Sequence, residues 1–195
     1  MSRYVTPEQF FAAAMGLLAG PGLPALRIGR LCREVGVTSG SFYHHFTNWD
    51  AFVAALLEHW TEDQVERVAR LVRDEGDPVR RVEVIERLAL AVPHEAETAI
   101  RSWAATDDVV ASAQRRVDQR RREVLTEVFL PLVGDERLAS TLAELGLSIL
   151  VGYQQRHDRD ESSVPLAALF EQYARLVREH TVQAYDARLA AALGR

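Results

Sequence analysis

The sequence has a single cysteine, no lysine and no long hydrophobic run. Cys32 has no partner for a disulfide within the chain, which fits a reducing compartment. No apolar stretch approaches the roughly 18 residues that a membrane-spanning helix needs. The opening segment MSRYVTPEQFF lacks the charged start and apolar core of a secretory signal. We therefore expect a soluble cytoplasmic protein with no membrane partner. All 23 basic residues are arginine, which reflects genome composition more readily than function.

Motifs of the common enzyme classes are also missing. The chain has no GxSxG, no P-loop, no GxGxxG after a strand and no HExxH. The six histidines show no metal-ligand spacing, and the pair His94-Glu95 lacks a second histidine four residues after the first. An enzyme and a metal or redox sensor are the competing classes, and these observations argue against both. We expect no catalytic residue, no cofactor and no bound metal.

Charge is distributed unevenly along the chain. With 23 basic and 28 acidic residues, the net charge is −5. Residues 23–49 depart from this balance, because they hold Arg27, Arg30 and Arg33 against Glu34 alone. A small basic surface on an acidic body suits nucleic acid, since the basic part attracts phosphates while the rest is kept away from them.

Apolar residues recur at helical spacing through almost the whole chain, and no run alternates as a strand does. The pattern predicts an all-α protein. Thr6 and Pro7 are typical of an N-cap and a first-turn proline, while Gly36 and Pro131 with Gly134 mark helix ends. The expected helices cover residues 7–19, 27–34, 38–46, 48–74, 78–91, 93–105, 107–130, 135–156 and 164–190.

The clearest break in composition is Gly76-Asp77-Pro78. It separates a compact N-terminal part from a larger helical body. We expect a three-helix helix-turn-helix domain in residues 1–47, a connecting helix in residues 48–75, and a second helical domain in residues 76–195.

Residues 27–46, RIGRLCREVGVTSGSFYHHF, are typical of two short amphipathic helices joined by a glycine turn. Gly36 can take the left-handed conformation that ends a helix, and the Thr38 hydroxyl can cap the next helix. On that next helix, Val37, Phe42 and Phe46 fall on one inward face. Any small helical core can contain such a turn, so spacing alone leaves a purely structural role open.

The outward face of the second helix carries groups that suit DNA. Ser39 and Gly40 are small enough to let the helix start approach a duplex, and serine hydroxyls serve phosphates or base edges. Tyr43 offers a ring to a thymine methyl and a hydroxyl to a phosphate, and His45 can donate to the DNA backbone. Helix pairs of this kind place the second helix in the major groove. The pattern favours DNA recognition over a structural role.

The same stretch resembles the N-terminal domain of the TetR family of bacterial repressors. The family's Ala-Gly-Val-Ser, followed by Gly and Tyr-x-His-Phe, corresponds here to VGVT, Gly40 and YHHF. The resemblance covers about residues 8–58. It implies that Ser39, Gly40, Ser41 and Tyr43 contact the groove and that His45 contacts a phosphate. The whole expected DNA-binding set is Arg27, Thr38, Ser39, Gly40, Ser41, Tyr43, His44, His45 and Trp49.

Three positions depart from the family pattern. Arg27 replaces the usual hydroxylated residue at the start of the second helix, and it can contact phosphate but not cap in the same way. Cys32 replaces a small alanine and is interpreted as a core residue. Trp49 stands where a phosphate-binding lysine or arginine is usual, and its indole either donates to a phosphate or packs.

Beyond residue 58 the resemblance is one of layout. It implies a body that binds a small-molecule effector and forms a homodimer through its last two long helices, 135–156 and 164–190. The apolar stripes of these helices suit a four-helix interface, but they also suit an intramolecular core. The candidate effector-pocket residues are Trp103, Phe129, Tyr153 and His157, although a large aromatic side chain on a helix is usually core.

Five arginines, at positions 115, 116, 120, 121 and 122, form a basic run in the helix expected at 107–130. They alternate with Asp118 and Glu123, so we expect a solvated, salt-bridged face here and no second nucleic-acid site.

Taken with the resemblance, the sequence predicts a transcriptional regulator with no enzymatic activity. The expected mode is repression, with activation as the alternative. A homodimer would bind a pseudo-palindromic operator in double-stranded DNA and would be released by a small-molecule effector.

Overall fold

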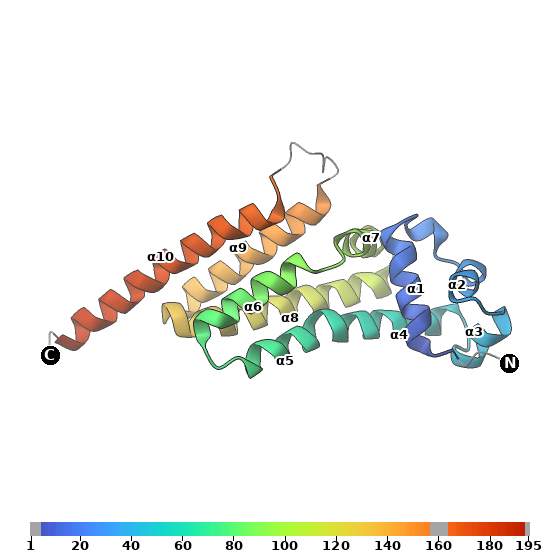
Figure 1. The fold of residues 1–195 in the computed structure, drawn as a ribbon, viewed down its shortest axis with the longest axis horizontal. Coiled ribbons are helices and arrows are strands. Elements are labelled where there is room, and N and C mark those ends of the chain that lie inside the picture. Colours follow the sequence, from blue (N-terminus) through green and yellow to red (C-terminus); the bar gives the residue numbers. More distant parts are fainter. Residues whose placement is uncertain (1–4, 157–163, 194–195) are drawn as a thin grey trace. The chain divides into compact units, whose positions relative to one another are not determined.

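A computed structural model describes residues 5–156 and 164–193, with side chains described to residue 181. The described residues form helices and no strand, as expected for an all-α protein (Figure 1). No helix among them is long and apolar enough to span a membrane. The elements are α1 (Pro7–Ala19), η1 (Leu23–Ala25), α2 (Ile28–Val35), α3 (Ser39–His45), α4 (Trp49–Thr61), η2 (Glu62–Glu66), α5 (Arg67–Asp74), α6 (Pro78–Leu90), α7 (His94–Ala104), α8 (Asp108–Val133), α9 (Glu136–Gln155) and α10 (Leu166–Leu193).

Side chains that cap the backbone set several helix starts. At the start of α1, the backbone N–H of Thr6 donates to Gln9 Oε1 at 3.1 Å. Asn48, Asp77 and Asp135 each accept a backbone N–H of the first turn, at 2.8, 2.9 and 2.7 Å respectively. Such caps satisfy amides that have no partner inside the helix, so short polar residues define where these helices begin.

Of the two residues expected to end α8, Gly134 does so and Pro131 does not. Pro131 lies inside the helix, which continues to Val133 and not to residue 130 as expected. Gly134 has a left-handed φ of 69°, and its N–H donates to the Leu130 carbonyl at 2.8 Å. Proline lacks an amide donor and its ring crowds the carbonyl four residues earlier, yet α8 continues past it for two residues because the buried Val133 packs in the core.

The single helix expected over residues 48–74 consists of three segments. α4 is followed by one turn of π-helix, η2, before α5 begins. A π-turn adds one residue to the repeat and rotates the side chains that follow it. Periodicity within the sequence does not reveal this insertion.

The chain divides into two compact units. The first unit comprises Met1–Gln64 and Pro93–Arg116, and the second comprises Val65–Val92 and Val117–Arg195. The first unit therefore includes α7, which the sequence interpretation assigned to the C-terminal domain. The functional division at residues 47 and 75 stays a prediction.

Aromatic side chains form the centre of the first unit. Five of the seven phenylalanines, Phe10, Phe11, Phe42, Phe46 and Phe52, are buried there. Their neighbouring ring centroids lie 5.1–6.2 Å apart, mostly in edge-on or tilted arrangements. Rings at such separations add to the free energy of burial, so α1, α3 and α4 are fixed around one shared cluster.

The second unit has its own apolar core, built from α5, α8, α9 and α10 and covered by half-buried side chains of α6. Its tightest point is the contact of α9 with α10. The Tyr173 hydroxyl donates to the Leu142 carbonyl at 2.6 Å, and its ring lies against Gly146. Burial raises the pKa of Tyr173, so the phenol stays protonated and remains a donor.

Gly146 should therefore tolerate no larger residue. A Cβ at this position would lie 3.0 Å from the Tyr173 hydroxyl oxygen and 3.1 Å from its ring carbons. Since Tyr173 is held by its hydrogen bond, Gly146→Ala should lower the free energy of unfolding by about 1–3 kcal/mol. Chemical denaturation measures this.

Gly16→Ala provides the control, because Gly16 is an exposed glycine inside α1 and its Cβ would meet nothing within 4 Å. That variant should gain about 0.5–1 kcal/mol from helix propensity. Equal stability of the two variants would contradict the packing argument.

Candidate nucleic-acid interface

The turn between α2 and α3 has the geometry that the sequence predicts. Gly36 follows α2 with φ 78° and ψ 37°, in the left-handed region. Its N–H donates to the Arg33 carbonyl at 3.2 Å, and the next N–H, of Val37, donates to the Cys32 carbonyl at 2.9 Å. These two bonds close the end of α2 and redirect the chain into α3 within two residues.

Thr38 does not act as predicted. It is the N-cap of α3 in extended conformation, but its side chain makes no capping hydrogen bond. Its carbonyl alone accepts, from the N–H of Ser41 at 3.1 Å. The Thr38 side chain is exposed, so its hydroxyl is left available to a ligand.

The inward and outward faces of α3 are separated as expected. Phe42 and Phe46 are buried, with exposed fractions of 0% and 6%, whereas Tyr43 is 56% exposed. Among the other residues of α3 that are predicted to contact DNA, Ser39, Gly40 and His44 are exposed. Ser41 and His45 are half-buried. The helix thus presents small polar groups and the exposed side of the Tyr43 ring to solvent, while Val37, expected to face inward, is half-buried.

His45 lies at the edge of the aromatic cluster. Its ring centroid is 5.9 Å from that of Phe10 and 5.2 Å from that of His44. The pKa of the nearby Glu8 carboxyl is lowered by a hydrogen bond from Thr6, and more weakly by the charges of His59 and His45. Packing on Phe10 therefore fixes the imidazole at the end of α3, beside the start of α1.

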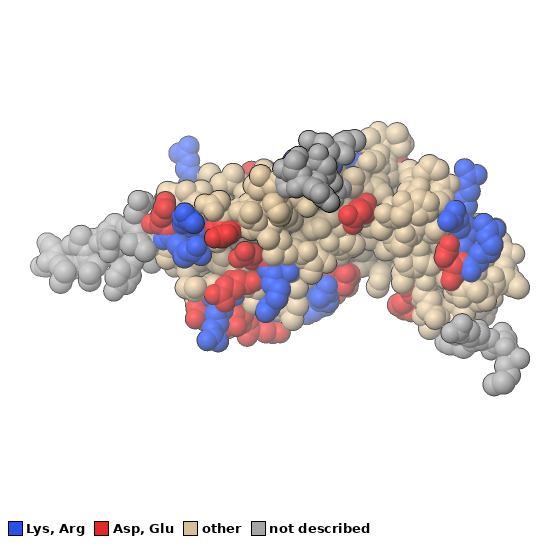
Figure 2. Space-filling model, turned by 45° about the horizontal axis from the view of Figure 1, so that its top comes forward, with Lys and Arg blue, Asp and Glu red and all other residues tan. Residues whose placement is uncertain are grey.

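Arginines line the exposed side of α2. Arg27 is the N-cap of α2 and makes no capping bond; its Nε donates to the Pro24 carbonyl at 3.0 Å. Arg30 pairs with Glu34 at 3.7 Å, and both side chains are nearly half exposed. Figure 2 shows basic side chains gathered on the surface of the first unit, at the right of the view, with acidic groups among them. The exposed side of α2 thus offers guanidinium groups that can bind DNA phosphates.

Trp49 is the first residue of α4, and its ring packs against Phe52. It is half-buried, and its ring centroid lies 5.3 Å from that of Phe52. Cys32 of α2 is 4% exposed and forms no disulfide, and burial raises the pKa of its thiol. The interpretation of Cys32 as a small core residue is confirmed.

The candidate effector-pocket residues that the structure describes come from both units, and two of them, Phe129 and Tyr153, share the core of the second. Trp103 is buried in α7 of the first unit, Phe129 is buried in the core of the second, and Tyr153 is half-buried against that core. His157 lies outside the described residues. Their role in binding an effector stays a prediction.

A cavity of about 650 Å³ opens between α1 and α2 in the first unit. It is lined by small and apolar residues with Gln9, Arg30 and Glu34 at its polar side, and by none of the four candidates.

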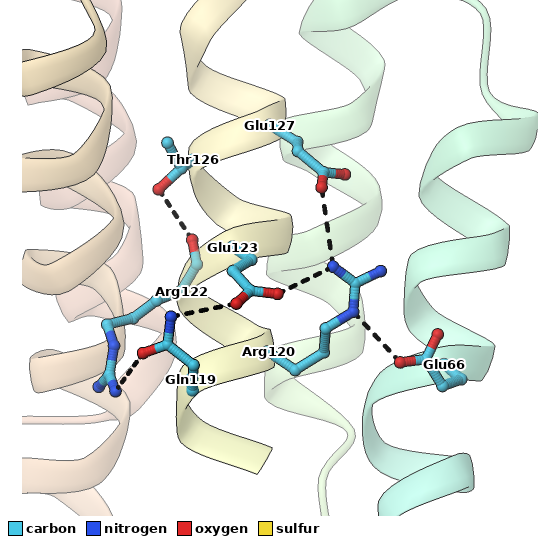
Figure 3. A network of polar contacts seen from close by, with 7 residues as sticks. All are labelled: Glu66, Gln119, Arg120, Arg122, Glu123, Thr126 and Glu127. Carbon is cyan, nitrogen blue, oxygen red and sulfur yellow. Dashed lines mark hydrogen bonds and ion pairs between the residues drawn. The ribbon is translucent and has the colours of Figure 1, made fainter. Parts of the chain in front are cut away.

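Two of the five arginines in the run on α8, Arg120 and Arg122, form the ion pairs predicted for this face (Figure 3). Arg120 contacts Glu66 of η2 at 3.2 Å, Glu123 at 3.2 Å and Glu127 at 3.7 Å. Arg122 contacts Gln119 at 3.1 Å and pairs with Glu144 of α9 at 3.8 Å. These pairs lie within the second unit and link η2, α8 and α9, so the two guanidinium groups are engaged with carboxylates and amides of the protein.

Sequence reasoning missed one buried polar pair. Trp60 Nε1 donates to Glu97 Oε1 at 2.9 Å, and both side chains are buried. A signal was present, because Glu97 falls on the same helical stripe as Ala96, Ile100 and Trp103, where an acidic residue is unusual. Among the described residues, no group of three histidine, cysteine or acidic side chains is placed to hold a metal ion.

A glycine turn, a supported helix and an exposed polar face together define a helix-turn-helix DNA-binding protein. Residues 10–56 match the family model described as bacterial regulatory proteins, tetR family. Residues 10–56 therefore carry the DNA-binding domain of this family, within the segment, residues 8–58, where the sequence resembles it.

Curated relatives share part of the sequence. The chain is 31% identical over 80 residues to the nucleoid occlusion factor SlmA of Aliivibrio fischeri, which is 41% of each protein. It is 28% identical over 118 residues to SlmA of a Marinomonas species, 60% of this chain and 56% of that one. The chain spans about two fifths of the length of the first of these relatives.

Solved structures share the fold over nearly the whole chain. A transcriptional regulator from Rhodococcus superposes with a TM-score of 0.68 at 23% identity, covering 94% of this chain and 97% of that one. A TetR transcription regulator from Haloarcula marismortui gives 0.62 at 21% identity, covering 93% and 96%. The arrangement of helices is therefore that of known regulators.

Gly40 gives a test of the interface. Its backbone is helical, and a Cβ there would meet only Thr38 Oγ1, at an ordinary 3.6 Å. Packing within the protein does not require a glycine, so Gly40→Ala should keep or slightly raise the free energy of unfolding. Close approach to DNA does require it. The variant should bind the DNA site preferred by the wild type about 1–3 kcal/mol more weakly in an anisotropy titration.

Gly16→Ala serves again as the control, because it adds the same methyl group to an exposed helix outside the expected interface. It should leave DNA affinity unchanged. If Gly40→Ala also leaves DNA affinity unchanged, α3 does not approach DNA through this residue.

Proposed function

We propose that this chain is a TetR-like transcriptional repressor of the cytoplasm. A homodimer binds a pseudo-palindromic operator in double-stranded DNA, and a small-molecule effector releases it. The observation that carries the proposal is the exposed polar face of α3 on a rigid aromatic base, in a segment that matches the family model.

Recognition of bases falls to α3. A helix fits the major groove, where base edges carry a distinct pattern of donors, acceptors and methyl groups. Ser39 and Gly40 allow the start of the helix to enter, and Ser41 lies on the same first turn. Tyr43, with more than half of its surface exposed, reaches furthest into solvent.

The flanking residues hold the DNA backbone. Arg27 at the start of α2 and His45 at the end of α3 each offer a donor to a phosphate, with Thr38 and His44 beside them. Such contacts fix register and carry little sequence information. Trp49 can add its indole N–H while its ring stays packed on Phe52.

Exposed apolar side chains on α9 and α10 support the homodimer. The stripes of these helices are divided: Leu142 and Tyr173 face the core, whereas Leu145 and Leu176 are 40% and 36% exposed. Large apolar side chains left exposed on neighbouring helices suit burial against the same surface of a second copy.

An effector acts by binding better to a conformation that cannot hold DNA. Such a ligand shifts the population away from the DNA-bound state by its difference in affinity for the two states. Trp103, Phe129, Tyr153 and His157 remain the proposed contacts, each testable by substitution once a ligand is known.

The proposal is tested by selecting duplexes from a random-sequence pool with the wild-type chain. It should enrich a two-fold related sequence. For that duplex, Tyr43→Ala should reduce affinity by about 1–3 kcal/mol, the size of a good base contact. Tyr43→Phe keeps the ring and removes the hydroxyl, so it separates contact with a thymine methyl from contact with a phosphate. Unchanged affinity in Tyr43→Ala would remove Tyr43 from the interface.

The dimer surface has its own test. Leu145→Arg and Leu176→Arg should weaken self-association by about tenfold or more, since each buries a charge in an apolar contact. Sedimentation velocity over a concentration series measures this. Leu71→Arg is the matched control, because Leu71 is 43% exposed on α5 and lies off this surface. If all three variants dimerise like the wild type, the interface lies elsewhere.

A further inference from the structure

A buried hydrogen bond joins two helices of the first unit that are distant in sequence. Trp60 Nε1 in α4 donates to Glu97 Oε1 in α7 at 2.9 Å. Trp60 is 2% exposed and Glu97 is 0% exposed. A carboxylate is costly to bury, and a buried polar pair is a weak means of stabilising two helices compared with apolar packing. We therefore look for the role of this hydrogen bond in how it positions α4 and α7 relative to each other, and not in stability.

α7 is part of the unit that carries the DNA-reading helix. It packs against α1 (Figure 1) and against η1. Its residues Ala96, Ile100 and Trp103 are buried. α1 in turn contacts α4, because the rings of Phe11 and His59 stack at 4.9 Å. The end of α4 is thus held from two sides, by α1 at His59 and by α7 at Trp60.

α4 supports the recognition helix directly. Phe52 of α4 packs against Phe42 of α3 at 5.4 Å and against Phe46 at 5.1 Å between ring centroids. The chain from α3 to α4 is three residues long. A shift or rotation of α4 therefore moves the base on which α3 rests.

Apolar contacts between helices tolerate small slides, whereas a hydrogen bond fixes a distance and a direction. We propose that Glu97 is a positioning residue for operator recognition: through Trp60 it sets the position of α4 beneath α3. This inference rests on the proposed function. The DNA-reading unit then consists of α1 to α4 together with α7, and the state of α7 sets operator affinity.

The test uses the full chain and four variants. Trp60→Phe removes the donor, Glu97→Leu removes the acceptor, and the double variant removes both. Glu97→Gln keeps an oxygen that accepts the indole N–H. Each is titrated against the duplex enriched by the wild type and against a shuffled duplex, at temperatures where denaturation shows the variant fully folded.

Tyr173→Phe is the matched control. It also removes one buried hydrogen bond, here to the Leu142 carbonyl in the second unit. A general loss of stability would affect this variant and Trp60→Phe alike.

Trp60→Phe and Glu97→Leu should each weaken operator binding by about 2- to 30-fold, the range for residues that act without touching the ligand. Binding to the shuffled duplex should change less. Glu97→Gln should remain within about twofold of the wild type, and the double variant should lose less than the product of the single losses. Tyr173→Phe should keep operator affinity.

Two results would overturn the inference. One is operator affinity within twofold of the wild type in both folded single variants. The other is a loss in Tyr173→Phe equal to that in Trp60→Phe, which would mark a general effect of stability. If the wild-type chain enriches no duplex at all, the proposed function fails before the positioning of α4 is in question.

Discussion

Edge-on packing of phenylalanine rings is the constraint on which the DNA-reading surface depends. Phe42 contacts the rings of Phe10 and Phe52 and is fully buried. The helix α3 has only seven residues, too few to be stable alone in water. Its conformation and its outward face therefore come from the side chain that it buries. On the exposed side, Ser39 and Gly40 have no ring to add to this packing, whereas Tyr43 contacts Phe42 edge-on at 5.5 Å between ring centroids.

Much of this arrangement could be predicted from the sequence, where a local rule determines the outcome. Gly36 ends α2 because glycine alone takes the left-handed conformation without strain. Phe42 and Phe46, four residues apart, share a face, and this leaves Tyr43 outside. The alternation of arginine with acidic residues on α8 correctly indicated ion pairs. The resemblance to the TetR family supplied the predicted DNA-contacting residues, which spacing alone would have left open, and these stay predictions.

Other features could not be predicted, because they depend on contacts between residues distant in sequence or on tertiary packing that overrides a local preference. Pro131 continues α8 since Val133 is buried beyond it. Thr38 leaves its hydroxyl unused although the residue type favours a cap. The π-turn of η2 has no signature in the hydrophobic period. Glu97 finds its donor 37 residues away, a pairing that helical periodicity does not encode. Residues that would hold an effector are still harder to predict from the sequence, because they depend on the shape of a cavity and not on a motif.

The two units interleave along the chain, and this has a consequence for synthesis on the ribosome. The first unit is interrupted by residues 65–92, which belong to the second. When α4 emerges, its Trp60 has no carboxylate to bind, and α1 has one flank uncovered. At about 5–20 residues per second, the intervening segment alone takes roughly 1–6 s to be made. Through that interval the nascent helix-turn-helix segment lacks α7, so the Trp60 indole and the side of α1 that α7 covers stay exposed until residues 93–104 are made.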